Sequence, residues 1–538
     1  MPYGNASPQT SKSATVPASV GGVNTVAALS MMRPEECIYA FNLLPGDGGQ
    51  RVREGYREWA NGWTGGPART VITFEGNTAS DDRLFVANDQ GIWDVSTEYD
   101  VSPTKVVTFG TATGNAGICS FVNFSNDGNA RFLLVCDGAN GYYRWTQATN
   151  TWVKYTEGTS AGQIENTNPA LFDFIMVWKE RIWFIQRETS RAWYLGPGVF
   201  EGAVAAFNFG AQFKHGGALK ALHNWTLDGG AGIDDQLVAI SGAGDVVIYQ
   251  GTNPAEAASF GLVGSWFVGA VPSGNRIAAE VAGELYILSI QGLLPLSTVL
   301  NGADVNDFNV YLTAKISPYI RTVLTATSDA FGWQIHVNTK QSLLTISAPP
   351  REGFDRIGFA MYQGNKAWGI TRGLPAASTA NWRKDVFFTD IVTNKIYKYH
   401  GFIDKDYIAA DVDGQPEGIV WDVLTAYQNL EEPANFKRVH YIRPMFTAVG
   451  VPSFTVRAQY DFDVSLISGM PTFGGAGTAL WDAGLWNAGV WSGGLEKTDS
   501  PRGATGMGRH IAVNIRGVSG EDTVLVGYDV VYDVGGLM

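Results

Sequence analysis

The pattern of hydrophobic and polar positions is most regular from about residue 69 onwards. Runs of β-branched and aromatic residues alternate there with short polar turns, most of which contain glycine. Each pair of runs predicts a β-hairpin, because strands favour these residue types and glycine tolerates tight turns. The clearest copies are RLFVANDQGIWDVS (83–96), RFLLVCDGANGYYRWT (131–146), RIWFIQRETSRAWYLG (181–196) and LVAISGAGDVVIYQG (237–251), and weaker copies follow at 284–297, 356–370 and 385–401.

The spacing of these hairpins predicts a repeat architecture. Early copies begin roughly 50 residues apart, which is the spacing of four-stranded propeller blades, and further strand-like runs such as TVITF and KVVTF flank the first copy. We therefore predict a β-propeller over residues 66–410, with about six blades and room for a seventh. One segment, NDFNVYLTAKISPYIRTVL, has helical spacing of its apolar residues and predicts a short helix inserted between blades.

The two ends of the chain have a different character. Residues 1–25 are rich in Ser, Thr, Ala, Asn and Pro, which predicts a flexible arm. Residues 411–538 contain longer runs with period-two alternation, which predicts a C-terminal antiparallel β-sheet platform domain. We expect residues 26–65 to form the N-terminal segment of the same platform.

Composition supports an all-β fold. The 538 residues include 65 glycines and 12% aromatic residues, a pairing that suits short strands and tight turns better than helices. The formal net charge is −13, the wrong sign for a protein that grips nucleic acid through its phosphates. Such a charge promotes solubility, and it would also let a polyanion slide past without adhering.

Several classes of protein are disfavoured by what the chain lacks. Its three cysteines, Cys37, Cys119 and Cys136, are odd in number and form no CxxC, so neither a disulfide framework nor a cysteine-rich zinc site is indicated. The first residues lack the apolar core of a signal peptide. No run approaches the roughly 18 apolar residues of a membrane span, so we expect no stable membrane insertion.

No catalytic, cofactor-binding or metal-binding constellation emerges from the sequence, and we predict no catalytic residues, no cofactor and no metal. GTSAG places Ser160 in a nucleophile-elbow pattern, but the following QIENTNPAL has no helical stripe, which favours a surface turn. The pairs Asp404/Asp406 and Asp411/Asp413 fail the EF-hand pattern because Pro416 replaces its glycine. Asp234 and Asp235 remain candidates only in the weak sense that glycosidase carboxylates are paired in space. The six histidines are dispersed.

Two features near the C-terminus are candidate interface or packing sites. In WDAGLWNAGVWSGGL, tryptophan recurs every fifth residue, at Trp481, Trp486 and Trp491. Neither a helix nor a flat strand places such rings on one side, so the glycines predict bends that reset the alternation. We favour a packed seam or subunit interface over stacking against sugars. The second feature is the basic cluster in NFKRVHYIRP, with Lys437, Arg438, His440 and Arg443, which favours one side of a protein interface.

Several segments, taken in order, resemble one family. They are NLLPGDGGQRVREGYREWANG, RLFVANDQGIWDV, CDGANGYYRW, AYQNL with FKRVHYIRPMF, the tryptophan ladder with its trailing RGATGMG, and the closing GYDVVYDVGG. Together they resemble the tail nozzle proteins, also called tail tubular protein B, of short-tailed podovirus-type bacteriophages. The resemblance covers the chain from about residue 38 to its end.

This resemblance implies a structural virion protein without enzymatic activity, made in the host cytoplasm and located in the phage tail. A β-propeller would be joined to a platform built from both chain ends. Six copies would form the lower tail tube below an adaptor ring, retaining and conducting double-stranded genomic DNA without sequence-specific binding. Tail fibres or receptor-binding proteins would attach around it. The alternative is a tail-tip propeller that binds or hydrolyses host surface polysaccharide.

Overall fold

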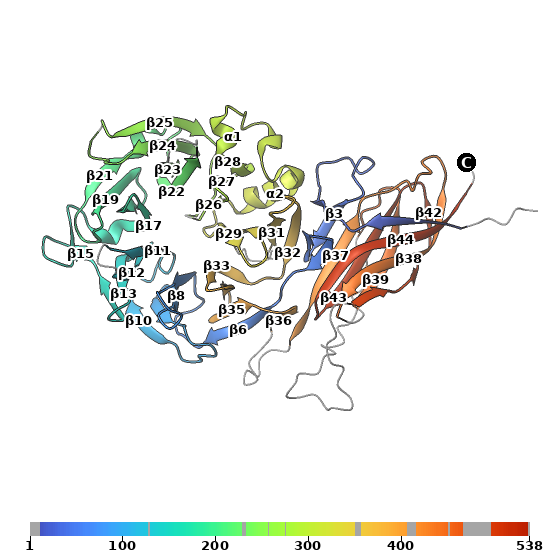
Figure 1. Cartoon of the computed structure of the whole chain (residues 1–538), viewed down its shortest axis with the longest axis horizontal. Helices are drawn as coiled ribbons and strands as arrows, with labels where there is room; N and C mark the ends of the chain where they lie inside the picture. The colour runs from blue at the N-terminus through green and yellow to red at the C-terminus, as the bar shows by residue number, and fades with distance from the viewer. Residues whose placement is uncertain are drawn as a thin grey trace, which may run out of the picture.

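The chain folds into a ring of β-sheets beside a two-sheet platform (Figure 1). The computed structural model describes residues 11–126, 130–228, 233–256, 258–274, 276–349, 357–405, 416–449, 452–465 and 496–535. In these ranges the prediction of an all-β protein is confirmed, because the sheets account for most of the structure and helices are confined to short connections.

Six separate sheets of the described chain are the blades of a β-propeller. Blade 1 contains β7 (Thr70–Phe74), β8 (Arg83–Asn88), β9 (Gly91–Asp94) and β10 (Thr104–Thr108); blade 2 contains β11 (Cys119–Ser125), β12 (Arg131–Asp137), β13 (Gly141–Thr146) and β14 (Thr151–Lys154). Blade 3 contains β17 (Phe172–Trp178), β18 (Arg181–Gln186), β19 (Arg191–Pro197) and β21 (Ala205–Asn208); blade 4 contains β22 (Leu219–Asp228), β23 (Ile233–Ser241), β24 (Asp245–Gly251) and β25 (Phe260–Phe267). Blade 5 contains β26 (Ala278–Val281), β27 (Glu284–Ser289) and β28 (Gly292–Pro295); blade 6 contains β33 (Ala376–Trp382), β34 (Asp385–Asp390), β35 (Lys395–Tyr399) and β6 (Tyr56–Asn61).

A seventh unit of four strands lies between blades 5 and 6 and continues into the platform. This joining unit contains β29 (Gln334–Asn338), β30 (Leu343–Ser347), β31 (Ile357–Tyr362) and β32 (Trp368–Arg372). The first strands of successive units contact one another around the axis, and β33 contacts β7 to close the ring. The six blades and the additional unit agree with the count that the hairpin spacing predicts.

Short elements fill the connections between blades. A small parallel sheet contains β15 (Thr156–Glu157), β16 (Gln163–Glu165) and β20 (Gly202–Ala203), and single 3₁₀ turns form η1 (Pro169–Leu171) and η2 (Phe209–Gln212). Between blade 5 and the joining unit lie α1 (Leu296–Leu300), η3 (Phe308–Val310), η4 (Ala314–Ile316) and α2 (Ser317–Thr327). The predicted helix insertion is therefore confirmed.

All seven predicted hairpins are present, and a buried polar residue recurs where the second strand of a blade ends. Examples are Asn88, Asp137, Ser241, Ser289 and Asp390, each buried. Asp137 accepts a hydrogen bond from the backbone N–H of Gly117 at 2.6 Å, which ties the turn to the segment entering its own blade. Asn88 does the same by donating to the carbonyl of Thr64 at 2.9 Å. In these turns the polar residue is thus an internal cap, since a buried polar group must be hydrogen-bonded.

The platform is a sandwich of two sheets. The first has the order β4 (Leu43–Gly46), β5 (Gly49–Val52), β44 (Thr523–Val534), β38 (Lys437–Ala448) and β40 (Glu496–Asp499), with β1 (Lys12–Pro17) on β44 and with β41 (Arg502–Gly503) and β42 (Met507–Gly508) on β38. The second continues from the joining unit through β3 (Glu36–Phe41), β37 (Glu417–Thr425), β43 (Ile511–Ser519) and β39 (Ser453–Tyr460), with β2 (Gly22–Val23) and β36 (Ile403–Asp404) at its sides. Phe446 of the first sheet packs against Trp421 and Phe454 of the second, with ring centroids 5.9 and 5.1 Å apart.

Two details of the expected domain boundaries are wrong. The flexible arm expected for residues 1–25 does not include β1, which pairs with β44 over its full length and buries Val16. Backbone hydrogen bonds to a neighbouring strand hold this Ser- and Thr-containing segment despite its polar composition. Within the platform segment expected for 26–65, β6 instead forms the outer strand of blade 6 by pairing with β35. Both pairings join residues hundreds of positions apart, which local patterns do not encode.

Candidate functional site

The predicted basic cluster lies on β38, the strand that crosses the middle of the eight-stranded sheet. Alternation along this strand buries Val439 and Ile442 in the sandwich and exposes Arg438, Tyr441 and Arg443. Lys437, Arg438 and Arg443 are therefore not one surface. The prediction of a single basic interface patch applies only to its exposed members.

Lys437 is fully buried, and its ammonium donates to the backbone carbonyls of Asn435 at 3.0 Å and Arg509 at 2.6 Å. Burial lowers the pKa of Lys437, because the charged form loses its hydration. The side chain fixes the loops at the end of β38. Lys437 is therefore a packing residue in this structure.

Carboxylates of the same sheet contact two other members of the cluster, Arg443 and His440. The guanidinium of Arg443 pairs with Asp529 on β44 and lies 3.3 Å from the Asp499 carboxylate. The His440 imidazole lies 2.8 Å from Asp533, also on β44. Carboxylates of its own sheet therefore match the charge of Arg443, which suits contact with another protein better than contact with phosphates.

Apolar side chains accompany these charges. Tyr441 is 55% exposed and Met507, on the neighbouring β42, is 56% exposed. The register pairs Arg438 with Met507 and Tyr441 with Gly503, so the apolar groups and Arg438 lie on adjoining strands. We call Arg438, Tyr441, Arg443 and Met507 the platform patch. The predicted ladder of Trp481, Trp486 and Trp491 lies outside the described residues, as do Asp406, Asp411 and Asp413.

Candidates that the sequence disfavoured are not brought together. Ser160 lies in an exposed turn, where its backbone N–H donates to the Gln163 side chain at 3.0 Å. Asp404 pairs with Arg53, and Asp235 accepts a hydrogen bond from Thr226 at 2.7 Å. In the ranges that the structure covers, no group of three or more His, Cys, Asp or Glu side chains is placed to hold a metal ion. The three cysteines are free thiols and buried.

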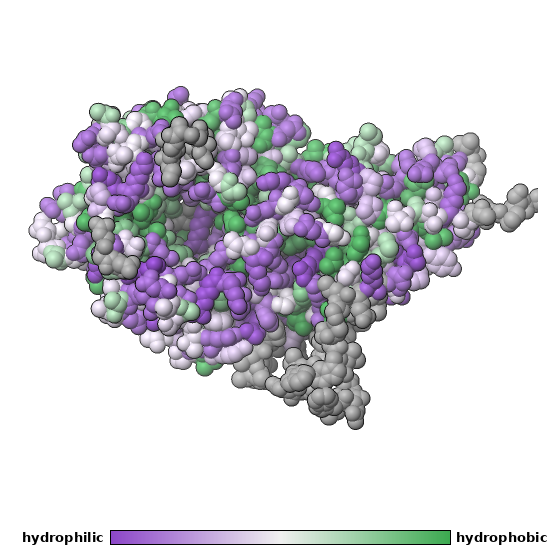
Figure 2. Space-filling view, viewed as in Figure 1, coloured by the Kyte–Doolittle hydropathy of each residue, from purple (hydrophilic) through white to green (hydrophobic). Residues whose placement is uncertain are grey.

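A pocket at the axis of the propeller was not foreseen from the sequence. It has a volume of about 440 Å³ and is lined by the segments entering blades 1, 2, 5 and 6 and the joining unit. Polar groups come from Arg69, Asp89, Asn115 and Arg276, and apolar side chains come from Phe331 and Ile391. The face of the ring in view is hollowed at its centre (Figure 2).

Arg276 lines this pocket and connects three blades. Arg276 precedes blade 5 in the sequence. Its Nη1 nevertheless donates to Ser378 Oγ of blade 6 at 2.6 Å, and its Nη2 donates to the Cys119 carbonyl of blade 2 at 3.0 Å. Burial lowers the pKa of Arg276 to about 10, so the group stays cationic at neutral pH. Among the described residues it forms no ion pair with a carboxylate.

Nothing local in the sequence distinguishes Arg276. It opens an apolar run, RIAAEV, as Arg83, Arg131 and Arg181 open the runs RLFVAN, RFLLVCD and RIWFIQ. Those three arginines begin the second strands of their blades, whereas Arg276 stands before a first strand. Only the closure of the ring brings its guanidinium to the axis.

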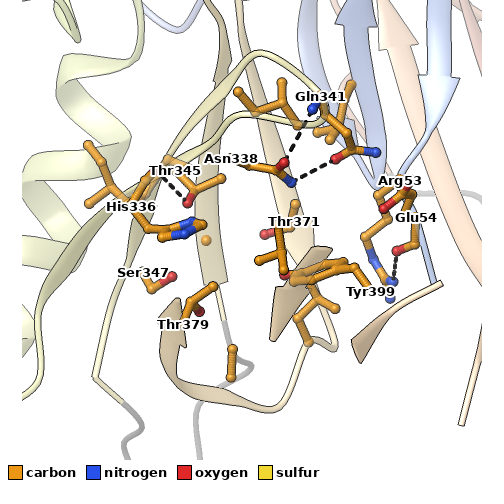
Figure 3. Close-up of a pocket in the computed structure, with 18 of the residues that line it drawn as sticks. Arg53, Glu54, His336, Asn338, Gln341, Thr345, Ser347, Thr371, Thr379 and Tyr399 are labelled. Atoms are coloured by element: carbon orange, nitrogen blue, oxygen red, sulfur yellow. Dashed lines mark hydrogen bonds between the residues drawn. The ribbon is translucent and has the colours of Figure 1, made fainter. Parts of the chain in front are cut away.

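A smaller cavity lies where the joining unit meets blade 6 (Figure 3). Its volume of about 60 Å³ is room for water and not for a substrate. His336 lines it, and burial lowers the pKa of that imidazole to about 4. Asn338 and Gln341 bond each other across a turn at 3.2 Å, and Thr345 donates to the His336 carbonyl at 3.1 Å. We regard this cavity as part of the joint between propeller and platform.

Among the described residues, no helix is both long and apolar enough to span a bilayer. No family model matches the chain, and no curated protein matches it.

Solved structures match the chain at low sequence identity. The extracellular domain of a protein described as a hybrid two component system, from B. thetaiotaomicron, has 10% identity and a TM-score of 0.39, covering 71% of this chain and 49% of that one. The chain thus spans about half the length of that structure. The computationally designed Ika8 protein has 10% identity and a TM-score of 0.35, covering 64% of this chain and 99% of its own. The β-propeller domain of Myceliophteria thermophila Cps50 (Swd1) has 10% identity and a TM-score of 0.37, covering 63% and 98%.

Proposed function

We propose that this protein is a structural component of a short-tailed phage virion, the nozzle at the lower end of the tail tube. Six copies would form a ring below an adaptor ring, retain and conduct genomic DNA through the lumen, and anchor fibres or receptor-binding proteins. The proposal originates in the family resemblance of the sequence segments.

The observation that carries it is the construction of the platform from both chain ends. Strands β1 to β5 precede the propeller and β37 to β44 follow it, yet they share two sheets and one hydrophobic core. A propeller with a platform of this composition is what the nozzle resemblance implies. The joining unit makes one sheet continuous from the ring into the platform, so a load on either part is transmitted through backbone hydrogen bonds.

The platform patch is the surface that we assign to subunit contact. Exposed aromatic, thioether and arginine side chains are enriched in the cores of protein interfaces. The charge of Arg443 is already paired with Asp529 within the sheet, so a neighbouring copy could cover this arginine without stranding a buried ion.

The net charge of −13 supports passage of DNA over adhesion to it. Like charges repel at separations up to roughly the 8–10 Å Debye length of physiological salt. A lumen lined by acidic protein would therefore keep the duplex centred and mobile.

Immunogold electron microscopy tests the location. Antibody against this chain is applied to particles from the culture that produces it, and gold is expected at the lower end of a short tail. Particles that remain unlabelled even after mild disruption would contradict a virion role.

A second experiment tests the surface. The purified chain, alone and with its adaptor, is examined by size-exclusion chromatography with light scattering and by negative-stain microscopy. Six-membered rings are expected, and Tyr441→Asp should abolish them while the monomer stays folded. Exposed Val392→Asp, in the turn between β34 and β35 of blade 6, is the matched control, because Val392 is 68% exposed but remote from the platform sheets. Rings that persist in Tyr441→Asp would show that the platform patch is not part of the subunit interface.

A further inference from the structure

We propose that the axial pocket of the propeller binds a sugar acid, with the carboxylate on Arg276 and a hydroxyl on Asp89. This inference concerns the single chain and does not depend on the nozzle role or on ring assembly. Three independent features of the pocket lead to it.

The first feature is a cation without a counterion. A guanidinium has five N–H donors, and Arg276 uses two of them on Ser378 and Cys119, neither of which carries a negative charge. A charge that loses part of its hydration, as this one does, is costly unless it is paired. The side chain is partly exposed within the pocket, so an incoming carboxylate can supply the missing charge. Its fork of donors matches the two oxygens of a carboxylate.

The second feature is an acceptor without a donor. Asp89, in the turn between β8 and β9, lines the pocket, and its buried Oδ1 has no hydrogen-bond partner among the described residues. Such an atom loses hydration without compensation. A ligand hydroxyl would satisfy it, whereas a second ligand carboxylate would be repelled. Asp89 therefore selects for a ligand that also donates.

The third feature is the volume of the pocket together with its apolar lining. About 440 Å³ falls within the roughly 300–1,000 Å³ of small-ligand pockets. Phe331 and Ile391 contribute apolar side chains to the lining, and the Asn115 amide contributes polarity. The apolar C–H face of a pyranose packs against such side chains, while its hydroxyls meet the polar groups.

Together these features favour a hydroxylated carboxylate over a simple anion. Inorganic phosphate could pair with Arg276, but as a compact dianion it would face the Asp89 carboxylate and leave the apolar lining uncovered. A neutral hexose could satisfy Asp89 and leave Arg276 unpaired. A uronic acid supplies a carboxylate for Arg276, a hydroxyl for Asp89 and an apolar C–H face for the apolar lining.

The test is isothermal titration of the purified full chain with galacturonate, glucuronate, galactose and inorganic phosphate at neutral pH. We expect at least one uronate to bind, at least tenfold more tightly than galactose or phosphate. Arg276→Gln and Asp89→Asn should each weaken that binding at least tenfold. Arg33→Gln is the control, because Arg33 is 75% exposed on a distant platform loop, and it should leave the affinity unchanged.

Asp89→Asn keeps the size of a pocket-wall side chain, so it tests the site even if Arg276→Gln fails to fold. No binding of either uronate at millimolar concentration would overturn the proposal. Equal affinity for galactose would overturn the role of Arg276, and equal affinity for phosphate would show an anion site without sugar recognition, which also contradicts it. Absence of rings in solution would not bear on these outcomes.

Discussion

Arg53 and Asp404 form a two-point ion pair at the place where the chain passes from the platform into the propeller and back. Arg53 Nη1 lies 2.7 Å from Asp404 Oδ1, and Nη2 lies 2.5 Å from Oδ2. Arg53 stands between β5 and β6, and Asp404 follows blade 6 on β36. Arg53 Nε also donates to the Asn42 side chain at 3.0 Å, and that same oxygen accepts from the Arg372 N–H at 2.8 Å. Both crossings of the chain are thus held at one buried junction.

Removing one partner should cost far more than removing both. Arg53→Met leaves the Asp404 carboxylate without its counterion, and we expect a loss of about 3–5 kcal/mol in the free energy of unfolding. The double variant Arg53→Met/Asp404→Leu should recover at least half of that loss. Arg51→Met is the control, because the 54% exposed Arg51 pairs with Asp522 at the surface and should lose less than about 1 kcal/mol. Equal losses in the single and double variants, measured by denaturant unfolding, would argue against a charge-based junction.

Asp137, the cap at the end of β12, should stabilise the fold through its acceptor oxygens. Asp137 Oδ2 accepts from the backbone N–H groups of Ala139 at 3.0 Å and Asn140 at 2.8 Å, in addition to the bond from Gly117. Asp137→Ala strands these buried donors, and we expect a loss of about 2–4 kcal/mol. Asp137→Asn keeps one acceptor and should lose less. Similar stability of wild type and Asp137→Ala in thermal unfolding would show that the turn is held by packing alone.

His336 should make stability fall at acidic pH. Burial depresses its folded-state pKa to about 4, whereas an unfolded histidine titrates near 6.5. The unfolded state therefore binds the proton more tightly than the folded state. The stabilisation from the neutral His336 side chain is fully present above about pH 6.5 and is lost as pH falls toward 4. When the pH falls from 7 to 4.5, the free energy of unfolding of His336→Gln should decrease by about 2 kcal/mol less than that of wild type. Parallel pH curves for the two proteins, from unfolding at each pH, would contradict this expectation.

Asp173, on the innermost strand of blade 3, should act in the opposite direction. Burial raises its pKa to about 7, against the partial opposition of Arg187 and Lys220. The folded state binds the proton more tightly, so stability decreases as pH rises from about 4 through 7. Asp173→Asn should be more stable than wild type by about 4 kcal/mol at pH 8, with little difference at pH 4. A constant difference across this range would indicate that the carboxyl is not buried as described.

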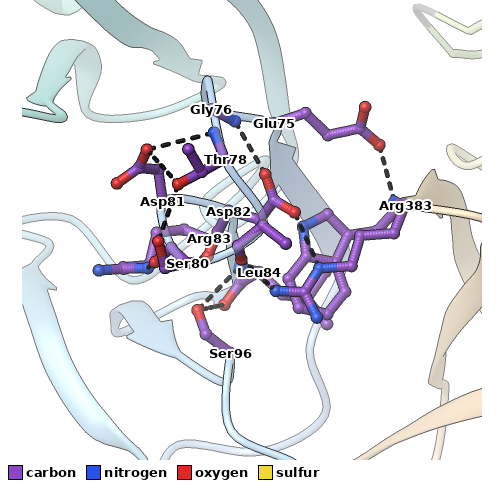
Figure 4. Close-up of polar contacts among 12 residues, drawn as sticks. Glu75, Gly76, Thr78, Ser80, Asp81, Asp82, Arg83, Leu84, Ser96 and Arg383 are labelled. Atoms are coloured by element: carbon purple, nitrogen blue, oxygen red, sulfur yellow. Dashed lines mark hydrogen bonds and ion pairs between the residues drawn. The ribbon is translucent and has the colours of Figure 1, made fainter.

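The seam where blade 6 meets blade 1 contrasts a buried ring with an ion pair whose arginine is partly exposed. Figure 4 shows this ion pair, between Arg383 and Asp82. Trp382 is buried and its indole N–H donates to the Phe74 carbonyl at 3.3 Å, whereas the adjacent Arg383 is 43% exposed and lies 2.9 Å from Asp82. Trp382→Ala should cost about 3–5 kcal/mol through the cavity that it leaves. Arg383→Ala should cost less than about 1 kcal/mol. Chemical denaturation of the two variants gives the comparison, and a larger loss for Arg383→Ala would reverse our ranking of these contacts.

Local patterns alone determined the hairpins, the all-β class and the helical insertion. Alternating apolar runs, glycine turns and polar caps such as Asn88 and Asp137 act over a few residues, so each hairpin is encoded where it forms. The sixth copy shows the limit of this information. Its hairpin, β31 and β32, is the outer pair of the joining unit and not the middle pair found in the blades.

Only the tertiary structure decided how these pieces associate. β1 pairs with β44 and β6 with β35 across hundreds of residues, because each open strand edge gains backbone hydrogen bonds that its neighbours in sequence do not offer. The same long-range closure buried Lys437, although it belongs to a basic sequence cluster, and brought Arg276 into the pocket that Asp89 also lines. Strand periodicity specifies which face of a strand is apolar, but the neighbour that covers that face is selected by the packing of the whole chain.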